Sequence, residues 1–154
     1  MRIAALTVLV LIAFVAPSRA EKLVPFSGTQ VVATAKPFKQ FVSDLKAAIG
    51  ANKMGIVAEA CAPCGAKSIG VTIPGNRVIM IYKPQFAVRM LEASVPAGIE
   101  APLRLYVTEE PDGTAKLTYR LPSHVFGAYE VAAPDEMAKE LDVIVARIVS
   151  DATR

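Results

Sequence analysis

The stretch from residue 103 to residue 121 constrains the fold most, because it predicts an antiparallel β-hairpin. Apolar and polar side chains alternate on both sides of Pro111-Asp112-Gly113, which is a typical turn sequence. Successive side chains of a strand point to opposite faces, so one face of this hairpin is expected to be buried and the other partly polar. The apolar positions are Leu103, Leu105, Val107, Leu117, Tyr119 and Leu121.

Three other segments repeat their apolar residues with the spacing of an α-helix. The first begins at Pro37 and ends at Gly50, the second runs from Pro84 to near Ser94, and the third begins at Pro134. Proline is favoured in a first helical turn and glycine just after a helix. The residues that share a face are Phe38, Phe41, Val42, Leu45 and Ile49 in the first helix; Phe86, Met90 and Leu91 in the second; and Met137, Leu141, Ile144, Val145 and Ile148 in the third.

The segments 29–35, 55–60 and 77–82 are rich in β-branched and apolar residues and predict three more strands. Residues 65–69 suit one or two helical turns, and residues 96–98 a loop. The resulting order is β-α-β-β-α-β-β-α. This order predicts a single α+β domain, with helices packed on one face of a mostly antiparallel sheet of about five strands.

Residues 1–20 have the features of a secretory signal peptide. Arg2 precedes an apolar run over residues 3–15, and small residues occupy positions 18 and 20 before the expected cut. The run is shorter than the roughly 18–20 residues that span a bilayer. We therefore expect a periplasmic or secreted chain without a stable membrane anchor, a flexible lead-in over residues 21–28 and a domain over residues 29–154.

The charge of the mature chain argues against a nucleic-acid partner. The full sequence has 17 Lys and Arg against 14 Asp and Glu, but Arg2 and Arg19 leave with the signal peptide, so 15 basic residues remain against 14 acidic ones. Binding to nucleic acid would need basic residues clustered on one surface.

Cys61 and Cys64, the only cysteines, form a Cys-x-x-Cys motif with Pro63 between them. Three interpretations stay open. The pair could form a local structural disulfide, which an oxidising compartment favours, or a soft-metal site for Cu or Zn, to which His124 could contribute. It could also be a redox dithiol that exchanges with an exported partner, with Lys67 helping to stabilise a thiolate. Covalent c-type haem is excluded because Gly65, not histidine, follows Cys64.

A second candidate site is the polar face of the hairpin, where Arg104, Tyr106 and Arg120 are predicted to lie together. Arginine binds carboxylates and phosphates with two parallel hydrogen bonds, so this face could hold a small anion while the disulfide is purely structural. His124, the only histidine, is expected in a loop after the hairpin. The chain has no Gly-x-Ser-x-Gly motif and no complete catalytic constellation, so we predict no catalytic residue.

Residues 75–84 (GNRVIMIYKP) and 101–113 (APLRLYVTEEPDG), together with the first helix and its Phe38, Phe41 and Leu45, resemble the bacterial and archaeal family called domain of unknown function 302. The resemblance extends over residues 30–152. It implies a compact α+β fold and a homodimer, and it implies no reaction. It does not account for Cys61 and Cys64. The sequence thus predicts an exported domain whose cysteine pair is redox-responsive or binds a soft metal, or alternatively a small-ligand module on the hairpin face.

Overall fold

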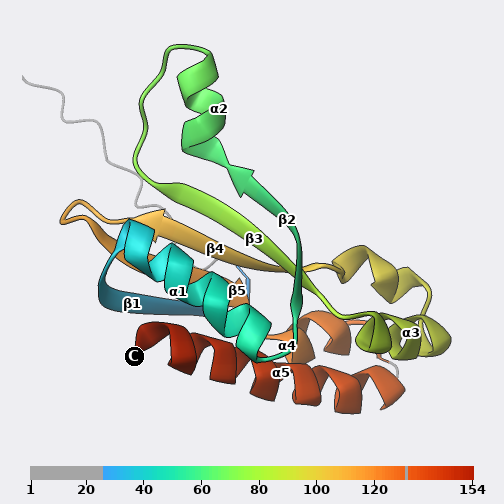
Figure 1. Cartoon of the computed structure of the whole chain (residues 1–154). Helices are drawn as coiled ribbons and strands as arrows, with labels where there is room; N and C mark the ends of the chain where they lie inside the picture. The colour runs from blue at the N-terminus through green and yellow to red at the C-terminus, as the bar shows by residue number, and fades with distance from the viewer. Residues whose placement is uncertain (1–25, 131) are drawn as a thin grey trace, which may run out of the picture.

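The computed structural model describes residues 26–130 and 132–154 (Figure 1). The predicted signal peptide, and the lead-in up to residue 25, lie outside the described residues.

Five antiparallel strands form one sheet within the described residues. They are β1 (Thr29–Pro37), β2 (Gly55–Cys61), β3 (Asn76–Tyr82), β4 (Leu103–Glu109) and β5 (Thr114–Arg120). Their order across the sheet is β1-β5-β4-β3-β2, so β1 and β2 are the two edge strands. The hairpin predicted from the sequence is the β4–β5 pair, in which Val107 faces Leu117.

Helices cover one face of this sheet, as the sequence predicted (Figure 1). α1 (Phe38–Ala51) and α5 (Ala132–Thr153) pack against each other beneath the strands, and α3 (Pro84–Ala93) packs against α5. Most of the predicted apolar positions are buried or half-buried, because burying them removes their surface from water. Leu91 of α3 is exposed, so the expectation that it shares an apolar face with Phe86 and Met90 in the core is wrong. Fully buried large side chains include Phe41, Leu45 and Ile49 of α1, Ile79 and Ile81 of β3, Leu105 and Val107 of β4, Leu117 of β5, and Met137 and Ile148 of α5.

Two short elements differ from the expectation of loops. Residues 96–100 form a 3-10 helix, η1 (Pro96–Glu100), and residues 122–127 form α4 (Pro122–Gly127). α4 begins with Pro122, whose missing N–H costs nothing in a first helical turn, and it buries Val125 and Phe126. The expectation that His124 lies in a loop is therefore wrong. A helix of six residues is too short to show a helical period in its sequence.

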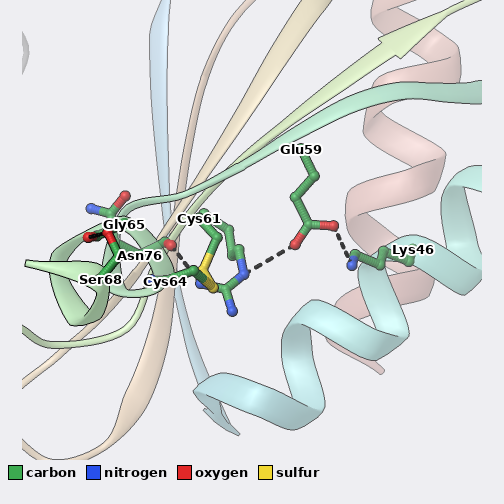
Figure 2. The surroundings of a disulfide bond; sticks show 8 residues. Lys46, Glu59, Cys61, Cys64, Gly65, Ser68 and Asn76 are labelled. Atoms are coloured by element: carbon green, nitrogen blue, oxygen red, sulfur yellow. Dashed lines mark hydrogen bonds and ion pairs between the residues drawn. A yellow bond between two sulfur atoms is a disulfide. The ribbon is translucent and has the colours of Figure 1, made fainter.

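A protruding segment, here called the cysteine arm, comprises residues 55–75: β2, α2 (Ala62–Ser68) and the return to β3 (Figures 1 and 2). α2 buries no residue, and six of the seven β2 residues are exposed. The large apolar side chains of the arm that are exposed are Ile56, Val57, Ile69, Val71 and Ile73. The arm is fixed at its base, where the Gly75 N–H donates to Glu109 Oε2 at 2.6 Å and the Glu109 N–H donates to the Gly75 carbonyl at 2.8 Å.

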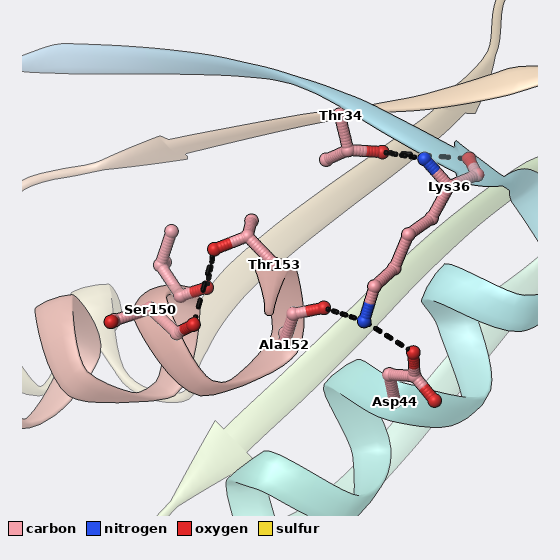
Figure 3. Close-up of polar contacts among 7 residues, drawn as sticks. Thr34, Lys36, Asp44, Ser150, Ala152 and Thr153 are labelled. Carbon is pink, nitrogen blue, oxygen red and sulfur yellow. Dashed lines mark hydrogen bonds and ion pairs between the residues drawn. The ribbon is translucent and has the colours of Figure 1, made fainter.

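A lysine ties the edge strand β1 to both long helices (Figure 3). Lys36 Nζ lies 2.6 Å from Asp44 Oδ2 on α1 and donates to the Ala152 carbonyl at 2.9 Å near the end of α5. A cation is favourable there because the last carbonyls of a helix lack intrahelical partners. The hydrogen bond from Lys36 lowers the pKa of Asp44. Within the described part of the chain, no helix is both long and apolar enough to cross a membrane.

Candidate functional site

The structure joins Cys61 and Cys64 in a disulfide, with 5.2 Å between their Cα atoms (Figure 2). Cys61 is the last residue of β2, and Cys64 lies in the first turn of α2. The Cys64 N–H donates to Cys61 Sγ at 3.0 Å. Cys61 is half-buried whereas Cys64 is exposed. The two cysteines are therefore inequivalent: Cys64 is the more exposed residue, and the Cys61 sulfur already accepts a backbone hydrogen bond.

A cation faces Cys61 from the neighbouring strand. Arg77 is paired with Cys61 in the β2–β3 register, and side chains directly opposite each other have Cβ atoms about 4.5–5.5 Å apart. Arg77 is held in place, since its Nε lies 3.0 Å from Glu59 Oε1 and its Nη1 donates to the Asn76 carbonyl at 2.8 Å. Glu59 also forms an ion pair with Lys46 of α1.

Sequence reasoning named Lys67 as the cation near the cysteines and missed Arg77. Lys67 lies on α2, in the last turn of the helix. Arg77 comes from a different strand, and its position depends on the register between β2 and β3. The position of Arg77 could have been predicted only by pairing the predicted strands 55–60 and 77–82 with each other in the correct register.

His124 lies at the other edge of the sheet, so it does not form one site with Cys61 and Cys64. Its Nε2 is 2.6 Å from Ser27 Oγ, just before β1, and Gly28 passes so close that a Cβ there would lie 2.3 Å from the imidazole Cγ. Four strand spacings of about 4.8 Å separate β1 from β2, which amounts to roughly 19 Å. The predicted metal set of Cys61, Cys64 and His124 is therefore not assembled within one chain.

The remaining donors do not complete a zinc site. Among residues 26–130 and 132–154, no three His, Cys, Asp or Glu side chains are grouped so that they could hold a metal ion. A structural zinc ion takes four ligands, so the two cysteines do not fit one by themselves. A reduced pair could supply only two thiolates to a soft ion such as Cu(I).

The second predicted site is brought together by the fold. Arg104, Tyr106 and Arg120 line one cavity of about 170 Å³, where β4 begins and β5 ends, next to η1 and α4. The other residues that line it are Thr29, Glu100, Leu103, Thr118, Tyr119 and Val125.

Glu100, which sequence reasoning did not single out, organises the polar side of this cavity. Arg120 Nη2 donates to Glu100 Oε2 at 3.3 Å, and the Tyr129 hydroxyl donates to Glu100 Oε1 at 3.1 Å. Burial, together with this hydrogen bond to a carboxylate, raises the pKa of Tyr129. The Tyr106 hydroxyl accepts a hydrogen bond from Asn76 Nδ2 at 2.5 Å, so this residue is anchored to β3.

Comparison with solved structures supports the fold. The chain is similar to the crystal structure of an uncharacterized conserved protein DUF302 from Bacillus stearothermophilus, with a TM-score of 0.73 and 19% sequence identity, over 84% of this chain and 100% of that one. No curated protein matches the sequence.

The family comparison agrees with the resemblance drawn from residues 75–84 and 101–113. The family model described as domain of unknown function DUF302 matches residues 30–151, which is most of the chain. This chain therefore belongs to the DUF302 family.

Proposed function

We propose that this protein is an exported thiol–disulfide redox module that exchanges electrons with thiol-bearing partner proteins through Cys61 and Cys64. The observation that carries the proposal is the asymmetry of the exposed disulfide. Cys61 accepts an amide hydrogen bond and faces Arg77, whereas Cys64 is open to solvent.

This asymmetry assigns different roles to the two sulfurs. In thiol–disulfide exchange, a thiolate attacks one sulfur and the other leaves as a thiolate, faster if that thiolate is stabilised. A partner thiolate would attack the accessible Sγ of Cys64, forming a mixed disulfide, and the Cys61–Cys64 bond would break with its electron pair going to Cys61. The Cys64 N–H and the Arg77 guanidinium would stabilise the Cys61 thiolate.

A second thiolate of the partner completes the exchange. It attacks the partner's own sulfur in the mixed disulfide, so the partner gains a disulfide and Cys64 leaves as a thiolate. The partner dithiol is oxidised by two electrons, and the Cys61–Cys64 disulfide is reduced by two. The two protons released by the partner thiols suffice to protonate both cysteines.

The surroundings of the disulfide suit a reaction that changes its state. α2 buries no residue, so the sulfurs can separate without opening the core. The exposed Ile69, Val71 and Ile73 follow α2 along the chain and offer apolar contacts to a partner segment.

The test uses oxidised full-length mature protein and reduced glutathione as the attacking thiol. Samples equilibrated across a glutathione redox series are quenched with acid, alkylated and measured by intact mass and peptide mapping. We expect the pair to pass from oxidised to reduced within the series, and the glutathione adduct to be on Cys64. A pair that stays oxidised throughout would be a structural disulfide and would refute the proposal, because structural disulfides resist the glutathione pool.

Two variants test the role of the cation. Arg77→Gln is expected to slow attack by glutathione, since the departing Cys61 thiolate loses its facing charge. Lys46→Gln is the matched control, because it removes the other ion-pair partner of Glu59 but does not face Cys61. Equal rates in the two variants would contradict the assigned leaving group.

Native mass spectra of the reduced protein with Cu(I) test the soft-metal alternative, which predicts one bound ion that is lost in Cys61→Ser.

A further inference from the structure

We propose that the cavity at the start of β4 and the end of β5 binds a short-chain monocarboxylate, with its carboxylate held by Arg104 and Arg120. This site is separate from the disulfide and does not depend on the redox proposal. The cavity contains both arginines, and they lie on β4 and β5, which are outside the cysteine arm.

The first argument is the placement of two positive charges on adjacent strands. Leu105 pairs with Tyr119 in the β4–β5 register, and continuing that antiparallel register by one residue places Arg104 opposite Arg120. Like charges directly opposite each other destabilise a sheet. An anion shared by the two guanidinium groups would remove this repulsion, and arginine is suited to bind a carboxylate through paired hydrogen bonds.

The second argument is the charge that remains inside the cavity. Glu100 neutralises Arg120, at 3.3 Å, and is held on its other side by Tyr129. For Arg104, no carboxylate of the described residues lies within ion-pair distance, so the cavity keeps one net positive charge. A bound monoanion would neutralise this charge, whereas a dianion would leave the cavity with an excess negative charge beside the Glu100 carboxylate.

The third argument is size and lining. The cavity, of about 170 Å³, has room for a small ligand of several heavy atoms. Leu103 and Val125 contribute apolar surface, and the ring of Tyr106 lines the cavity while its hydroxyl is anchored to Asn76. A carboxylate with a short hydrocarbon chain matches both the charged and the apolar parts.

The experiment is a titration of the oxidised protein with sodium butyrate, followed by amide chemical shifts in two-dimensional NMR spectra at constant ionic strength. We expect saturable shifts centred on residues 103–106 and 118–120. Butanol, which has a similar chain and no charge, is expected to bind at least about tenfold more weakly, because it cannot form the charge-assisted hydrogen bonds. Sodium phosphate, measured on the alkaline side of neutral pH where its dianion predominates, is expected to bind more weakly than butyrate.

Variants separate this site from general charge effects. Arg104→Gln is expected to weaken butyrate binding at least about tenfold. Arg147→Gln, which removes an exposed arginine of α5, is the matched control and should leave the affinity unchanged. Unchanged affinity in folded Arg104→Gln, equal binding of butanol, or tighter binding of phosphate would each overturn the proposal. The Cys61→Ser/Cys64→Ser variant should bind butyrate normally, so failure of the redox proposal would not affect this result.

Discussion

Loss of the Cys61–Cys64 disulfide is expected to lower the free energy of unfolding by about 2 kcal/mol or less. The bond closes a loop of sequence separation three, and in the chain-entropy model so short a loop constrains the unfolded chain by only about 2 kcal/mol. Loss of native-state contacts adds little to this cost, because α2 contributes no buried residue to the core. A redox module needs this small cost, since its fold must survive in both states.

The assay compares chemical and thermal denaturation of the oxidised protein, the reduced protein and the Cys61→Ser/Cys64→Ser variant. For a domain of this size, we expect the midpoint of thermal unfolding to fall by at most about 10 °C. Hydrogen exchange should localise the change. Amides of α2 are expected to lose protection on reduction, whereas those of α1 and α5 keep theirs, because α2 buries no residue and the two long helices supply the buried core.

Two results would refute this reasoning. Unfolding of the whole domain on reduction would mean that the cysteine arm is part of the cooperative core. Loss of exchange protection in α1 or α5 at the same time as in α2 would carry the same meaning. Either result would favour a structural disulfide.

Three further predictions concern stability. Gly75→Ala should lower the free energy of unfolding by about 1–3 kcal/mol in urea denaturation, because a Cβ there would lie 2.6 Å from the buried Phe38 ring. Gly50→Ala, in the helix α1 with nothing within 4 Å, should instead raise it by about 0.5–1 kcal/mol; a loss there would contradict the helix geometry. The pKa of Asp44 is lowered by its hydrogen bond from Lys36, so the stabilisation from this carboxylate is complete above its unfolded-state pKa, near 3.8, and is lost as the pH falls through the lowered value. Lys36→Met should therefore make stability less dependent on pH below about 4, as acid unfolding of the two proteins would show; identical acid profiles would contradict the assignment.

The sequence was sufficient for the elements that have a clear period. The spacing of Phe41, Leu45 and Ile49 predicted the buried face of α1, and the alternation around Leu105 and Leu117 predicted both the hairpin and its buried side. These patterns are local, and burial of apolar surface acts on each of them in the same way.

The arrangement of the candidate sites could not be predicted in the same way. Cys61 and His124 were plausible co-ligands until the strand order placed them at opposite edges, and strand order depends on long-range pairing that no local pattern records. Arg77 lies beside the cysteine pair but comes from β3, outside the Cys-x-x-Cys motif. Glu100 lines the arginine cavity but comes from η1, outside the hairpin. Arg104, Tyr106 and Arg120 were grouped correctly, because one hairpin contains all three.

The position of β1 at the edge next to β5 has a consequence for biosynthesis. Thr29 pairs with Arg120, so β1, the first of the described strands to leave the ribosome, pairs with a strand near the far end of the chain. The meander of β3, β4 and β5 can close through short loops, whereas β1 must remain unpaired until β5 has been made. While the chain is being synthesised, the apolar Val31 and Val32 of the unpaired β1 are the residues that a nascent-chain chaperone would have to protect from aggregation.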